Sequence, residues 1–133
     1  MINKYSFGRV DQFIIFGGGQ YLFDAVVHLM SLDIKVLVVT STRHHNSPVK
    51  SEGQAITLND ALSLMGIQCK LVGNLDSESN WKRIVTSETV GVSISAEWIF
   101  RRSIIELFHG RLVNLHGSRL PEMGGCGGLS WNM

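Results

Sequence analysis

The sequence has few cysteines and almost no net charge, and each shortage excludes a class of protein. Its two cysteines, Cys69 and Cys126, are far apart and lack any paired spacing. We therefore expect free thiols in a reducing compartment, the cytoplasm, rather than a disulfide framework. A formal net charge of +1 provides no broad basic field for nucleic acid or an anionic membrane. No apolar run reaches the roughly 18 residues of a membrane span, and the N-terminus has no signal-like stretch.

What the sequence does contain is enough apolar residues for a core. Its 133 residues are 44% hydrophobic and 17% charged, which predicts one compact domain. Five short apolar runs predict strands at 13–16, 36–39, 67–72, 90–94 and 112–115. Apolar residues at consecutive positions are typical of parallel strands that are covered on both faces. The run 67–72 alternates with polar residues instead and predicts an edge strand.

Helical patterns separate the predicted strands. An amphipathic pattern covers 20–31, a second helix is predicted from Thr57 to Gly66 with a capping box at its start, and a third from Trp98 to Phe108. This alternation predicts an α/β fold, a Rossmann-like, doubly wound and mainly parallel sheet with helices on both faces. Ligands of such folds bind beyond the carboxyl ends of the strands, where the polar loop 40–54 is expected.

A run of three glycines, Gly17 to Gly19, follows the first predicted strand and opens the first helix. Bare backbone N–H groups and the helix dipole would favour a phosphate there, although the glycines are equally compatible with a tight turn alone. The dinucleotide fingerprint is incomplete, because Leu22 stands where its third glycine is expected. We therefore do not expect a nicotinamide cofactor.

The other polar cluster lies at the end of the last predicted strand. Because side chains alternate along a strand, Asn114 and His116 point the same way. An amide can stabilise an oxyanion and an imidazole can shuttle a proton, although both residue types also occur at ordinary strand ends. By contrast, His44 and His45 lack further ligands at metal spacing and are typical of a loop, so we expect no metal.

The same segment resembles a known family. The pattern Asn114-x-His116-x-Ser118-x-Leu120-Pro121, followed by Gly125, is similar to the signature of the formyltransferases that use 10-formyltetrahydrofolate, which include glycinamide ribonucleotide and methionyl-tRNA formyltransferases. A glycine-rich stretch before Ser130 and Trp131 most resembles the branch that formylates dTDP- or UDP-linked amino sugars. The resemblance covers the order of elements from Phe13 onward.

The resemblance implies a set of site residues. Asn114 and His116 would be two members of an Asn-His-Asp catalytic set whose aspartate lies beyond Met133, so residues 1–133 would be an incomplete N-terminal catalytic domain. The formyl donor, 10-formyltetrahydrofolate, would lie against the segment that contains Trp98, Ile99 and Phe100. The substrate would contact a set of residues from two loops: Gly19, Gln20, Tyr21 and Ser118.

Several alternatives stay open. The acceptor implied is a nucleotide-linked amino sugar used in polysaccharide biosynthesis, but methionyl-tRNA or glycinamide ribonucleotide would serve the same chemistry. Gly124 stands where the family usually has an arginine, which bears on the acceptor. A noncatalytic remnant that binds folate or nucleotide without turnover is an alternative from another class. A homodimer is compatible with the resemblance.

Overall fold

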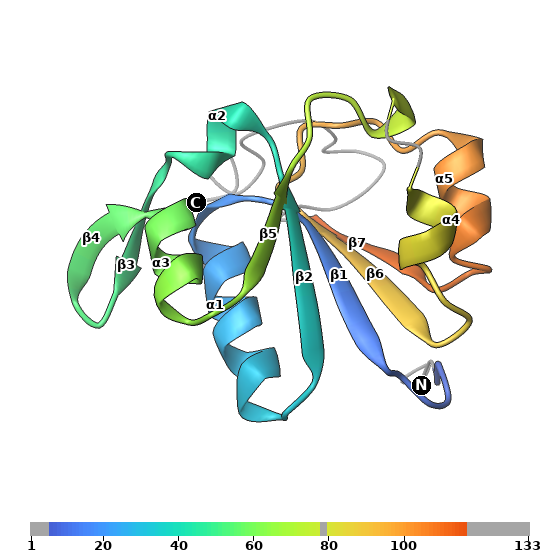
Figure 1. Cartoon of the computed structure of the whole chain (residues 1–133), viewed down its shortest axis with the longest axis horizontal. Helices are drawn as coiled ribbons and strands as arrows, with labels where there is room; N and C mark the ends of the chain where they lie inside the picture. The colour runs from blue at the N-terminus through green and yellow to red at the C-terminus, as the bar shows by residue number, and fades with distance from the viewer. Residues whose placement is uncertain (1–5, 78–79, 117–133) are drawn as a thin grey trace.

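The centre of the structure is a sheet of five parallel strands in the order β5-β2-β1-β6-β7 (Figure 1). The computed structural model describes residues 6–77 and 80–116. The strands are β1 (Gln12–Gly17), β2 (Lys35–Thr40), β5 (Gln68–Leu71), β6 (Thr89–Ile94) and β7 (Leu112–Leu115). All five coincide with the predicted apolar runs, and β5 lies at an edge of the sheet, as its alternating pattern predicts.

Helices cover both faces of the sheet, which confirms the predicted doubly wound arrangement. On one face α1 (Gly19–Ser31) and α3 (Leu58–Leu64) pack, and on the other the 3-10 turn η1 (Leu75–Ser77), α4 (Trp81–Ile84) and α5 (Arg102–Leu107) (Figure 1). Alternation along β1 divides its apolar side chains between the two cores. Ile15 belongs to the core under α1 and α3, whereas Ile14 and Phe16 belong to the core under α4 and α5.

The predicted polar loop 40–54 has more structure than its sequence suggests. It contains the short helix α2 (Thr42–His45) and leads into an antiparallel hairpin of β3 (Pro48–Ser51) and β4 (Gln54–Thr57). Glu52 and Gly53 join the two strands with φ angles of 50° and 79°, as expected for a two-residue hairpin turn. The strands are short and largely polar, so periodicity alone could not reveal them.

The third predicted helix is shorter than its sequence pattern suggests. We predicted a helix from Trp98, but α5 begins at Arg102. Tertiary packing explains the later start of the helix. Trp98 and Phe100 pack against the core under α4 and α5, and the chain before α5 follows that surface as an irregular segment. The second helix has the predicted cap, since the Thr57 hydroxyl oxygen accepts a hydrogen bond from Asp60 N at 3.1 Å.

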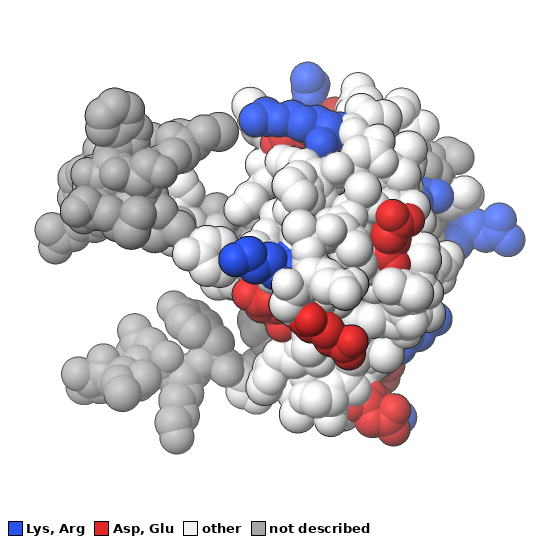
Figure 2. Space-filling view, turned by 90° about the vertical axis from the view of Figure 1, so that its left-hand side faces the viewer, with Lys and Arg blue, Asp and Glu red and all other residues white. Residues whose placement is uncertain are grey.

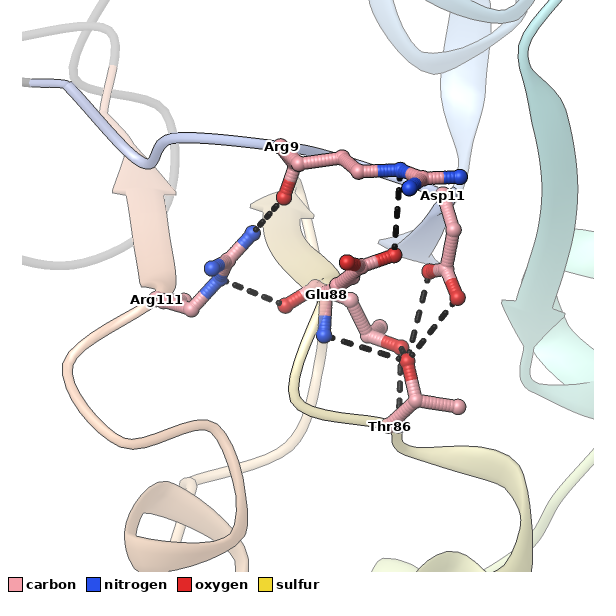
Figure 3. A network of polar contacts seen from close by, with 6 residues as sticks. Arg9, Asp11, Thr86, Glu88 and Arg111 are labelled. Carbon is pink, nitrogen blue, oxygen red and sulfur yellow. Dashed lines mark hydrogen bonds and ion pairs between the residues drawn. The ribbon is translucent and has the colours of Figure 1, made fainter.

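A polar network holds the amino end of the sheet together (Figure 3). Arg111, just before β7, donates to the backbone carbonyl oxygen of Arg9 at 2.9 Å. The Thr86 hydroxyl donates to both carboxylate oxygens of Asp11, at 3.1 and 3.3 Å. An ion pair of 3.5 Å joins Arg9 to Glu88, but the Arg9 side chain is 83% exposed, so the pair contributes little stability. The hydrogen bonds from Arg111 to the Arg9 backbone and from Thr86 to Asp11 therefore carry most of the attachment.

The surface carries charges of both signs. Seen from the side of the hairpin and α3, Lys and Arg side chains and Asp and Glu side chains are interspersed with uncharged residues (Figure 2). This face therefore has no large block of one sign. In the described part of the chain, no helix combines the length and the apolar character that crossing a bilayer requires.

Candidate functional site

The order of the strands places the topological switch point of the sheet between β1 and β6. From β1 the chain goes outward to β2 and β5, and it then returns to β6 on the other side of β1. In doubly wound sheets, ligands bind where the connections diverge in this way, beyond the carboxyl ends of the strands. The glycine turn after β1 and the segment after β6 meet at this point, because Gly18 N donates to Ile94 O at 3.2 Å.

The glycine turn is required by packing as well as by conformation. Gly17 has a φ of 132°, and a Cβ atom there would lie 1.8 Å from the carbonyl oxygen of Ile94. A Cβ atom on Gly18 would lie 2.4 Å from the Cβ of His44. The tight-turn interpretation therefore explains these two glycines. Gly19 differs, because at a φ of 83° its Cβ position has no neighbour within 4 Å among the residues that the structure describes.

Open space at Gly19 lies directly at the start of α1. The helix has no side-chain cap at Gly18 and no acidic residue in its first turn. Its first N–H groups therefore lack helical partners, and the helix dipole makes this end electropositive. The geometry suits an anion at Gly19, as the sequence indicated, and tight packing at the two preceding glycines does not exclude it.

His44 lies against this turn, although its sequence pattern was typical of a loop residue and indicated no further role. Its Cβ, Cγ and Nδ1 atoms are the nearest neighbours of the Gly18 position. Two buried polar atoms at this end of β2, Thr40 Oγ1 and His44 Nδ1, have no hydrogen-bond partner among the residues that the structure describes. Such atoms usually bind a ligand or an ordered water. In the sequence, the only indication that His44 lies near the site was its position after the carboxyl end of a predicted strand.

Gln20 has a structural function in the same region. Its side-chain oxygen accepts from Lys50 N at 2.7 Å, and its side-chain nitrogen donates to Lys50 O at 3.1 Å and to Asp24 at 2.9 Å. The amide therefore fastens the hairpin β3–β4 to α1. Tyr21 is 64% exposed. The predicted substrate contacts of Gly19, Gln20 and Tyr21 thus surround the first turn of α1, and their role stays a prediction.

The segment after β6 offers a different surface. Ser95 has a φ of 54°, which turns the chain away from the sheet. Trp98 and Phe100 are half-buried; the Trp98 indole N–H donates to Gly73 O at 3.2 Å, and the Phe100 ring meets Phe16 edge-on with centroids 5.1 Å apart. Ile99, between them, is 90% exposed.

Backbone groups in this segment have no backbone hydrogen-bond partner in the part of the chain that the structure describes. Within residues 6–77 and 80–116, no backbone group from Glu97 to Phe100 forms a hydrogen bond with another backbone group. Free N–H and C=O groups beside aromatic rings suit a flat heterocycle with several donors and acceptors. The role of Trp98, Ile99 and Phe100 in binding a cofactor stays a prediction.

The predicted catalytic pair lies at the far side of β6. Asn114 pairs with Ser93 across the sheet, and Ser93 in turn pairs with Phe16. Register therefore places Asn114 on the face of the sheet where Trp98 and Phe100 pack. Asn114 is exposed, and His116, which directly follows β7, is half-buried. Ser118 and the glycine-rich stretch lie outside the described residues.

No group of three or more metal-binding side chains occurs within the described ranges. The polar groups that the structure does bring to the carboxyl end of the sheet are an amide, imidazoles, hydroxyls and backbone N–H groups. These groups can bind an anion, donate to a developing oxyanion and transfer a proton. They form the candidate site.

The fold and the position of this site define a class of protein, the Rossmann-like α/β proteins that bind ligands at a switch point. Within this class, the chain is similar to phosphoribosylglycinamide formyltransferase from Bacillus halodurans, with a TM-score of 0.63 and 15% identity over 90% of this chain. It is also similar to glycinamide ribonucleotide transformylase 1 from Geobacillus kaustophilus, with a TM-score of 0.61 and 13% identity over 93% of this chain.

These similarities concern structure alone. The chain spans 63% of the length of the Bacillus halodurans protein and 67% of that of the Geobacillus kaustophilus protein. No protein-family model matches the sequence, and no curated protein does so either. At 13–15% identity, the common feature is the formyltransferase fold.

Proposed function

We propose that the protein to which this chain belongs is an N-formyltransferase, which transfers the formyl group of 10-formyltetrahydrofolate to the amino group of a nucleotide-linked amino sugar. The observation that carries the proposal is the position of Asn114 and His116 at the carboxyl end of β7, in a chain with the fold of formyltransferases. The similarity to the known formyltransferase structures concerns only the fold. The motif that begins at Asn114 supplies, in addition, an amide and an imidazole that suit formyl transfer.

The folate co-substrate fits the segment after β6. The unpaired backbone groups between Glu97 and Phe100 would hydrogen-bond the edge of its pterin ring. Trp98 and Phe100 are held by their contacts with Gly73 and Phe16, so their rings would form a rigid wall. Ile99, which is exposed, would cover the ring from the solvent side. When bound, the folate supplies the formyl group.

Asn114 and His116 would carry the transfer itself. As the acceptor nitrogen attacks the formyl carbon, negative charge develops on the formyl oxygen, and the Asn114 amide would donate a hydrogen bond to it. His116 would take the proton that the acceptor nitrogen loses and deliver it to the folate nitrogen as the bond between carbon and that nitrogen breaks. The products are a formamide and tetrahydrofolate, so the step balances without a metal or a redox partner.

A nucleotide-linked sugar is favoured as the acceptor by the glycine-rich stretch before Ser130 and Trp131. Its phosphates would bind the N–H groups at the start of α1, where Gly19 leaves open space. Glycinamide ribonucleotide is the second candidate, because the similar structures are named for that substrate and it carries a phosphate that the same helix end would bind. The reaction would belong to polysaccharide biosynthesis in the cytoplasm.

The first experiment measures binding of a nonreactive 10-formyltetrahydrofolate analogue to this chain by calorimetry. Ile99→Ala is the decisive variant, because a side chain that is 90% exposed contributes little to folding. Loss of its contact with the folate would weaken binding about tenfold. Leu64→Ala is the matched control, since Leu64 is an aliphatic residue that is 80% exposed on α3, and it should bind the analogue normally.

The acceptor is tested by titrating dTDP-linked and UDP-linked amino sugars and glycinamide ribonucleotide into the complex with the analogue. Preference for one nucleotide-linked sugar supports the proposal, and preference for glycinamide ribonucleotide replaces the acceptor but keeps the reaction. Binding rather than turnover is measured, because the resemblance implies a catalytic aspartate outside these 133 residues. A folded chain that binds no folate analogue would overturn the proposal.

A further inference from the structure

A second cleft lies at the opposite end of the sheet from the candidate site. It has a volume of about 580 Å³, within the range typical of small-molecule sites. Its walls come from the first residues of β1 and β2, from β5 and from α4. Both strand ends and the helix are part of the folded core, so the cleft is bounded by ordered secondary structure.

The floor of the cleft is one face of the sheet. Leu37 on β2 pairs with Gln68 on β5, and because side chains alternate, Lys35 and Lys70 point to the same face as these two residues. This is the face under α4, since Leu37 belongs to the core that contains Trp81. The two lysines therefore flank the floor at opposite ends, with an aliphatic residue and an amide between them.

The wall provided by α4 adds a third cation and an apolar surface. Arg83 and Ile84 line the cleft, whereas the preceding residue, Lys82, lines a different cleft, between α4 and α5. The short helix thus directs two neighbouring cationic residues to two separate surfaces. Ile84 is half-buried, so it presents part of its side chain to the cleft.

Positive charge predominates in the cleft. Among the described residues that line it, Lys35, Lys70 and Arg83 are cationic and Asp11 is anionic. Asp11 already accepts hydrogen bonds from the Thr86 hydroxyl (Figure 3). In the part of the chain that the structure describes, neither Lys35 nor Arg83 has an ion-pair partner. Two cationic groups that line one cleft and form no ion pair favour binding of an anion.

We propose that this cleft binds a small organic phosphate, with the phosphate group between Lys35 and Arg83 and an apolar portion against Leu37 and Ile84. A phosphate monoester carries about two negative charges at neutral pH, and Lys35 and Arg83 together supply two positive charges. Arg83 can bind two of its oxygens at once, in the bidentate geometry that a guanidinium group forms with phosphate. The site is separate from the formyltransferase site, and neither proposal depends on the other.

The experiment titrates the chain with three probes and follows backbone amide NMR shifts. Phenyl phosphate combines both features of the proposed ligand, inorganic phosphate has the charge alone, and benzoate replaces the phosphate by a carboxylate. We expect phenyl phosphate to bind most tightly, with the largest shifts in residues 68–70 and 83–86. Inorganic phosphate should bind several-fold more weakly, because it does not contact the apolar floor.

Three charge variants locate the site. Lys35→Gln and Arg83→Gln should each weaken phenyl phosphate binding about tenfold, because each removes a charge-assisted contact. Lys82→Gln removes the same charge from the neighbouring residue of α4 and should leave binding unchanged. Far-ultraviolet circular dichroism checks that all three variants fold, as expected for exposed side chains.

Three results would overturn the inference. One is the absence of saturable binding of phenyl phosphate to the wild-type chain. Another is equal weakening by Lys82→Gln, which would mean that only the general surface charge attracts the probe. The third is a shift pattern centred on Gly19 that Arg83→Gln leaves unchanged, which would assign phosphate binding to the start of α1 instead.

Discussion

Replacing Gly17 by alanine should be among the most damaging single-methyl additions in this chain. The new Cβ atom would lie 1.8 Å from Ile94 O and 2.8 Å from Ile94 C, atoms of a central strand that cannot move without breaking the sheet. Overpacking of a rigid core costs about 1–3 kcal/mol. The φ of 132° adds backbone strain of about 1–3 kcal/mol. With both costs near the middle of these ranges, we expect a loss of about 3–5 kcal/mol from the free energy of unfolding.

Gly19→Ala separates the two contributions to this loss. Gly19 also has a positive φ, 83°, but a Cβ atom there meets no atom of residues 6–77 or 80–116 within 4 Å. Only strain remains, so the expected loss is about 1–2 kcal/mol. Urea unfolding measures both variants, and with a slope of about 1.5 kcal/mol per M, Gly17→Ala should lower the midpoint by about 2–3 M. Equal losses in the two variants would refute the close approach of β1 and β6.

Gly18→Ala tests the contact with His44 in the same assay. Gly18 has an extended φ of −171°, so an alanine there is not strained, and the cost arises from its approach to the His44 side chain. We expect a loss of about 1–3 kcal/mol. His44→Ala should recover part of that loss in the double variant, because it removes the Cγ and Nδ1 atoms that the new methyl group meets. Strictly additive losses would show that the His44 ring does not meet the new methyl group.

Three further predictions concern other parts of the fold. Gln20→Leu removes both hydrogen bonds to the Lys50 backbone; it should cost about 1 kcal/mol and speed amide exchange in the hairpin, and unchanged exchange would contradict this. Arg111→Leu removes hydrogen bonds to two backbone carbonyl oxygens and should lower the free energy of unfolding by about 1–2 kcal/mol in urea. Burial raises the pKa of the Cys69 thiol, so less thiolate is present at pH 8 than in an exposed cysteine. In a Cys126→Ser variant, iodoacetamide should therefore modify the native chain more slowly than the urea-unfolded chain.

Features that depend on neighbouring residues were predictable from the sequence. The five strands, the start of α1 and the cap at Thr57 agree with the structure, because apolar periodicity and capping chemistry act within a few residues. The edge position of β5 followed from the alternation of Gln68 and Lys70 with apolar neighbours. The motif at Asn114 and its position at a strand end were likewise visible in the sequence.

Features that depend on contacts between distant segments were not predictable. Trp98 has the neighbours of a helix start, but the core under α5 holds it in an irregular segment. The strands β3 and β4 are too short and too polar to be recognised, and they are held by Gln20 from another element. His44 gains its position in the candidate site only because Gly18 has no side chain.

The sequence by itself determined which segments are strands, which end of the sheet carries the glycine turn, and which residues are chemically able to act there. Only the tertiary structure decided why Gly17 must be glycine, that His44 belongs to the site, and that Lys35 and Arg83 face a common cleft. The physical reason is the distance along the chain over which each effect acts. Hydrophobic periodicity and capping are local, whereas packing and electrostatic proximity arise when the sheet brings separate strands within a few ångströms.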